Sequence, residues 1–154
     1  MDRVPAYALV IGIVLALGAG GVMAVQPAVN GRLASSCSHP LQASIVSFGT
    51  GLIALVTVGL VLGIGLPDFR ELRALPLWAW TGGLLGTYMV TVSLLFAPQL
   101  GAVRWIALVL TGQIAVSLVL DQFGLIGFSR QPINSFRLLG VGLVVAGVIL
   151  VMRN

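Results

Sequence analysis

Residues 5–25 read PAYALVIGIVLALGAGGVMAV, an apolar run without one charged side chain. A helix needs about 20 such residues to cross a hydrocarbon core about 30 Å thick. We expect this first span to continue as helix to residue 33, and four comparable runs follow at 41–64, 77–97, 103–120 and 136–152. The sequence therefore predicts an all-α integral membrane protein with five transmembrane helices, in a single membrane domain covering residues 1–154.

Composition supports a lipid-facing surface and excludes several classes of protein. Hydrophobic residues make up 58% of the 154 residues and charged residues only 8%, against roughly 25% in soluble domains. The net charge is +4, but the arginines stand singly between apolar runs, so we expect no nucleic-acid partner. Cys37 is the one cysteine, and with His39 it forms neither a disulfide nor a metal site. We expect no metal and no cofactor.

Proline, glycine and tryptophan mark the limits of the spans. Pro98 and Gly101 predict a short turn that makes the third and fourth spans an antiparallel hairpin. Tryptophan favours the membrane–water interface, and three tryptophans lie at the starts of these two spans: Trp78, Trp80 and Trp105.

The orientation of the chain is only weakly specified by charge. An odd number of spans places the termini on opposite sides of the membrane. Five arginines lie on the N-terminal side and three on the other, a small bias toward a cytoplasmic N-terminus that also fits insertion in both orientations. The two groups are Arg3, Arg70, Arg73, Arg130 and Arg137, and then Arg32, Arg104 and Arg153.

The end of the first span carries two amides. Gln26 and Asn30 are four residues apart and share one face of a helix. Pro27 between them leaves the carbonyl of Met23 without its helical donor and favours a kink. One interpretation is a bent helix whose amides line a cavity. The other is a helix end, with Asn30-Gly31 as its C-terminal turn.

The fourth span carries a polar stripe at Gln113, Ser117 and Asp121. An acid within a membrane segment is a functional candidate, for a cation or a proton. We favour the other interpretation of Asp121, an interfacial residue bonded to nearby loop N–H groups, and we expect Gln113 to face protein or water. In an inverted dimer, Arg104 of one subunit would lie at the depth of Asp121 of the other, so an intersubunit ion pair is a hypothesis.

Several short segments together resemble a known family. They are Gln26-Pro-Ala-Val-Asn-Gly-Arg-Leu, Ser47-Phe-Gly-Thr-Gly51, Trp80-Thr-Gly-Gly-Leu-Leu-Gly86, Gly112-Gln113, Asp121-Gln-Phe-Gly124 and Arg137-Leu-Leu-Gly140. Over essentially its whole length the chain resembles the YdcZ-like family of the drug/metabolite transporter superfamily. The resemblance implies an all-helical inner-membrane transporter, similar to one five-helix half of the larger members, whose two halves are inverted. The first span lacks the glutamate of the small multidrug exporters, which argues against proton or cation antiport.

From the residues and the resemblance we expect a half-transporter that pairs as an inverted dimer, with itself or with a homologous five-helix chain. It would export a small neutral or zwitterionic solute across the bacterial inner membrane, as a multi-pass protein in contact with the lipid bilayer. The alternative is a non-transporting scaffold or accessory subunit; no catalytic set of side chains indicates an enzyme. We expect spans one to four to line a central cavity, with these residues facing it: Gln26, Asn30, Ser47, Tyr88, Gln113, Ser117 and, at one mouth, Asp121.

Overall fold

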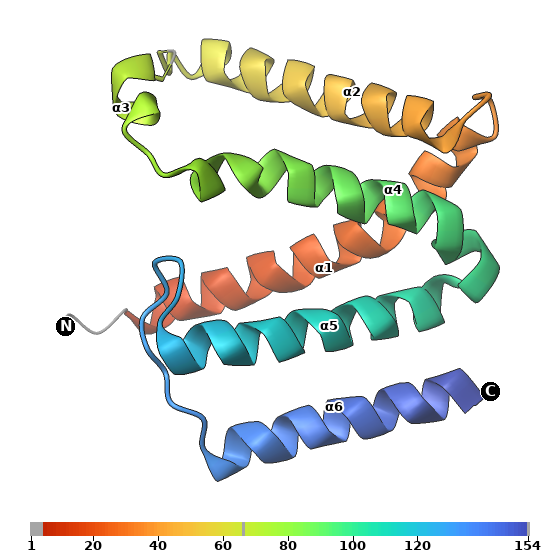
Figure 1. Ribbon diagram of the computed structural model, residues 1–154, viewed down its shortest axis with the longest axis vertical. Helices are drawn as coiled ribbons and strands as arrows, with labels where there is room; N and C mark the ends of the chain where they lie inside the picture. Colours follow the sequence, from red (N-terminus) through yellow and green to blue (C-terminus); the bar gives the residue numbers. More distant parts are fainter. Residues whose placement is uncertain (1–4, 66, 154) are drawn as a thin grey trace. The chain divides into compact units, whose positions relative to one another are not determined.

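The computed structural model describes residues 5–65 and 67–153, and within these ranges the regular structure is entirely helical (Figure 1). Five helices are long and apolar enough to cross a membrane, η1 and α4 counting together as one, which confirms the predicted number of spans. In chain order the elements are α1 (Ala6–Ala34), α2 (Pro40–Val61), α3 (Phe69–Arg73), the 3-10 helix η1 (Leu77–Thr81), α4 (Gly82–Leu100), α5 (Ala102–Phe123) and α6 (Ser135–Arg153).

Helix α1 decides between the two interpretations of the Gln26–Asn30 segment. It passes through Pro27 and ends only at Ala34, so the interpretation of Asn30-Gly31 as a helix end is wrong. A proline inside a helix removes one backbone hydrogen bond, and the long apolar helix on either side of it tolerates that loss. Gln26 and Asn30 therefore share a continuous helical face.

The turn between the third and fourth spans differs from the prediction. Pro98 lies inside α4, which ends at Leu100, and only Gly101 separates α4 from α5. Gly101 has φ of +82°, a conformation that glycine adopts without steric cost. Pro98 lies in the last turn of α4, so the helical hydrogen bond that it removes is close to the end of the helix.

Contacts divide the chain into two compact units, which we describe separately: a first unit that ends at Pro98, and a second that begins at Gln99. The centre of the first unit is the buried group Ala43, Val90 and Leu94, against which the end of α1 packs. Helices α2 and α4 meet through a hydroxyl pair, Ser44 to Thr91 at 3.1 Å. The ring of Phe48 lies against Gly86, where an added Cβ would come within 3.3 Å of it.

A capping box fixes the start of α2. The side chain of His39 accepts a hydrogen bond from the backbone N–H of Leu41 at 3.2 Å. In return, Oε1 of Gln42 accepts from the backbone N–H groups of Ser38 and His39. The reciprocal bonds satisfy donors that a helix start leaves unpaired. The connection 35–39 therefore holds α1 and α2 close together at one end.

The second unit consists of α5 and α6, which pack on each other and are joined by residues 124–134. Helix α5 ends at Gly124 in the left-handed conformation, with φ of +64°, as many helices do. Trp105 at the start of α5 is only 8% exposed, and the interfacial position of the three tryptophans stays a prediction. Trp78 and Trp80 are more than half exposed, as interfacial rings would be.

Candidate functional site

A cleft of about 510 Å³ opens in the first unit between α1, α2 and α4. Helix α2 supplies most of its wall, and α1 and α4 contribute one residue each. Its apolar wall would hold hydrocarbon groups of a solute by dispersion and by exclusion of water. The lining residues are Gln26, Ser47, Phe48, Gly51, Leu52, Leu55 and Val90.

Two polar side chains stand in this apolar wall, the amide of Gln26 and the hydroxyl of Ser47. None of the lining residues is charged. An amide and a hydroxyl can each donate and accept hydrogen bonds, but they cannot balance a full charge, which is costly to bury alone. The cleft is therefore suited to orient a polar group of an uncharged solute.

Asn30 lies one helical turn beyond Gln26 on the same face of α1. Its side chain is among the most buried in the first unit, with 5% of the residue exposed. Within the described part of the chain, its Nδ2 atom is buried without a hydrogen-bond partner. Buried amides are nearly always satisfied, so this enclosed and unpaired donor is an exception that packing within the chain does not explain.

A second cavity, of about 310 Å³, lies between α5 and α6 in the second unit. Asp121 and Arg137 form an ion pair at this cavity, with Oδ2 and Nη1 3.1 Å apart. Both side chains are about one-third exposed, at 32% and 34%. The lining residues are Ile114, Ser117, Leu118, Asp121, Arg137, Gly140, Val141 and Val144.

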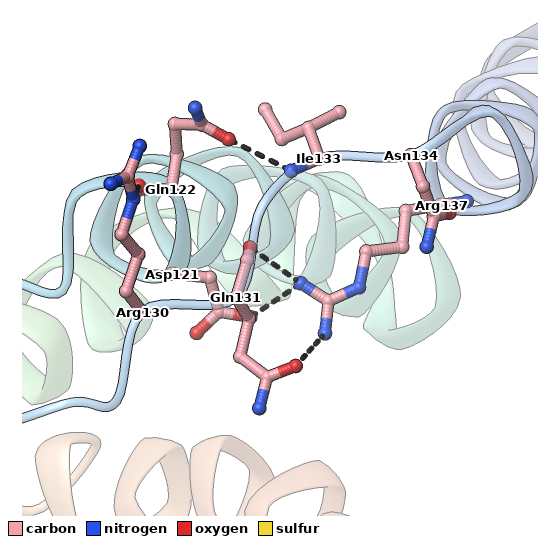
Figure 2. A network of polar contacts seen from close by, with 7 residues as sticks. All are labelled: Asp121, Gln122, Arg130, Gln131, Ile133, Asn134 and Arg137. Carbon is pink, nitrogen blue, oxygen red and sulfur yellow. Dashed lines mark hydrogen bonds and ion pairs between the residues drawn. The ribbon is translucent and has the colours of Figure 1, made fainter.

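Figure 2 shows that this ion pair belongs to a larger network around the α5–α6 loop. Arg137 also donates to the backbone oxygen and to Oε1 of Gln131, at 3.2 and 3.3 Å. The backbone N–H of Gln131 donates to the Asp121 carbonyl at 2.7 Å. Gln122 accepts from the N–H of Ile133 at 2.8 Å. The network ties the loop to the end of α5 and supports a structural role for Asp121.

Arg137 is the residue that the sequence analysis missed. Within the chain the carboxylate of Asp121 pairs with Arg137, and its pairing with Arg104 of a second subunit stays a prediction. Asp121 and Arg137 are 16 positions apart and belong to different helices. The signal available in the sequence was an acidic residue at the end of the fourth span, Asp121, and a basic residue at the start of the fifth, Arg137.

The seven predicted cavity residues fall into separate places. Gln26 and Ser47 line the cleft of the first unit, with Asn30 one turn away. Ser117 and Asp121 line the cavity of the second unit. Tyr88 is 71% exposed on α4 and Gln113 is exposed on α5, and neither lines these two cavities. That all seven face one central cavity stays a prediction.

Comparisons with known proteins give one family. No curated protein and no solved structure matches the chain significantly. The model of the family described as "Putative inner membrane exporter, YdcZ" matches residues 11–150, nearly the whole chain. With its five apolar helices, the chain therefore belongs to the YdcZ family of inner-membrane exporters and is a multi-pass protein of that membrane.

Proposed function

We propose that the chain exports a small molecule and that the cleft of the first unit is where the solute binds. The observation that carries this is the lining of the cleft, where Gln26 and Ser47 interrupt an otherwise apolar wall. Polar groups in membrane helices are costly unless they serve packing or a solute pathway. Membership of an exporter family supports the second role.

The transporting unit, in this proposal, is an inverted dimer, formed with a second copy or with a homologous five-helix chain. Carriers built from inverted repeats hold their solute near the membrane midplane, between the two repeats. Five spans in this chain do not divide into two repeats, so the second repeat would come from another chain. Spans one to four of both subunits would then line the central cavity.

Gly51 offers a steric test of the cleft. It lines the cleft, and a Cβ built on it meets no atom within 4 Å. Gly51→Leu should therefore place its side chain in the cleft without a clash at the Cβ atom. Gly49→Leu is the matched control, because Gly49 lies almost opposite on the same helix, is equally uncrowded and does not line the cleft.

The measurement is a mass-spectrometric comparison of small molecules in the growth medium of a bacterial host. Cells with the wild-type chain or Gly49→Leu should accumulate outside at least one solute that cells with Gly51→Leu, or with no chain, do not. If the media of cells with the wild-type chain and of cells with the empty vector contain the same small molecules, the result would favour the scaffold or accessory role. Export that survives Gly51→Leu would show that the solute does not use this cleft.

A further inference from the structure

Asn30 differs from the other buried polar residues of the first unit. Ser44 and Ser93 are buried to a similar extent, but both are satisfied. The Ser44 hydroxyl pairs with Thr91 at 3.1 Å, and the Ser93 hydroxyl donates to the carbonyl of Val90 at 2.7 Å. Only the amide nitrogen of Asn30 is both buried and without a partner among the described residues. An unmade hydrogen bond of this kind destabilises the fold, so packing alone does not account for an asparagine here.

The position of Asn30 relates it to the cleft. Helices α1 and α2 are joined through residues 35–39, so positions equally distant from this connection lie at similar depth. Asn30 is four residues before the end of α1, and Ser44 is four residues after the start of α2. Gln26 and Ser47, which line the cleft, lie about one turn further from the connection. Asn30 therefore lies beyond the cleft-lining residues, toward the end where the two helices are held together.

Charge limits which solute can occupy this region. Residues 6–31 of α1, all of α2 and all of α4 contain no Asp, Glu, Lys, Arg or His. A net charge, or either charge of a zwitterion, would find no opposite charge on these segments, and an unpaired charge in a low-dielectric site is strongly disfavoured. Phe48, Leu52 and Leu55 offer a mainly apolar surface in the same cleft.

We propose that the solute reaches past the cleft-lining residues to the enclosed side-chain amide of Asn30, which recognises it by donating a hydrogen bond to an acceptor oxygen or nitrogen on it. The solute is a neutral amphipathic molecule, with its apolar part against Phe48, Leu52 and Leu55 and its polar end toward Gln26 and Asn30. This inference rests on the proposed export through the same cleft. It adds the chemical class of the solute and the residue that donates a hydrogen bond to the polar end of the solute.

The test separates recognition from a structural role. Asn30→Leu removes the amide at similar volume, and Asn30→Ala removes it while leaving space. At least one of them should unfold at or above the wild-type temperature in detergent, because a buried unpaired donor is gone, and should lower export roughly tenfold or more. Ser44→Ala is the control for a structural polar group, and its unfolding temperature should fall because the Thr91 hydroxyl loses its partner.

The outcomes distinguish this inference from the function on which it rests. If Gly51→Leu stops export and either Asn30 variant exports normally, export through the cleft is supported and the role of Asn30 is overturned. If both Asn30 variants lose as much thermal stability as Ser44→Ala, the amide is structural and the inference is also overturned. If the solutes whose export depends on Gly51 are ions or zwitterions at neutral pH, the neutral class is wrong. If Gly51→Leu lowers the export of no solute, both the proposed function of the cleft and this inference are overturned.

Discussion

At the scale of single residues, the structure assigns the one acid beside a span to a structural network. The carboxylate of Asp121 faces a guanidinium that two other hydrogen bonds, both to Gln131, already hold in place. Such an arrangement orders the junction between α5 and α6, and leaves the carboxylate engaged instead of free to carry a cation. The polar residues that remain candidates for solute contact are amides and hydroxyls, which form hydrogen bonds without a change of charge.

A double-mutant cycle on Asp121→Asn and Arg137→Gln tests this pairing. We expect a coupling free energy of about 0.5–1 kcal/mol for a pair that is one-third exposed, measured by unfolding in detergent. The cycle of Asp121→Asn with Arg104→Gln is the control, and it should give a coupling near zero. A larger coupling with Arg104 than with Arg137 would instead support the intersubunit pair.

At the scale of elements, hydropathy was sufficient to predict the five spans, because the requirement for about 20 apolar residues per crossing is strong and local. The helix limits were harder to predict. Pro98 suggested a turn, yet it lies within α4, and Gly101 alone separates α4 from α5. Trp105 lies at the start of a span, and its sequence position did not show that its ring is buried. In both cases the outcome depends on packing that a single segment does not encode.

The loop that joins α5 and α6 contains two glycines whose backbone conformation would be strained for any other residue. Gly124 and Gly127 both have positive φ, +64° and +86°. A Cβ on Gly124 would lie 3.3 Å from the backbone of Phe128 and Arg130, whereas one on Gly127 would meet nothing within 4 Å. Gly127→Ala should cost about 1–2 kcal/mol for the left-handed conformation alone. Gly124→Ala should cost more, because crowding is added.

The measurement for this pair is the unfolding free energy of each variant in the same detergent. Equal costs would show that the loop relaxes around residue 124 and that the contacts with Phe128 and Arg130 do not constrain it. A larger loss for Gly124→Ala, accompanied by a weaker Asp121–Arg137 coupling, would show that the glycine holds the loop in the geometry that the ion pair requires.

At the scale of the whole molecule, the sequence predicts less of the site than of the fold. The i, i+4 spacing placed Gln26 and Asn30 on one face correctly, because that relation lies within one helix. It could not show that Ser47 lines a cleft with Gln26, or that Asp121 pairs with Arg137. Those relations depend on which faces of different helices meet, and apolar spans with many small residues allow several such packings.

The number of spans leads to a prediction about the assembly. If the chain pairs with an inverted copy of itself, it must insert in both orientations, and its weak arginine asymmetry permits this. Fusions of alkaline phosphatase and of a fluorescent protein to the C-terminus should then both be active. Arg70→Gln with Arg73→Gln removes positive charge from one side and should shift the ratio of the two signals. A signal from one side alone would exclude the inverted homodimer and require a homologous partner of opposite orientation for transport.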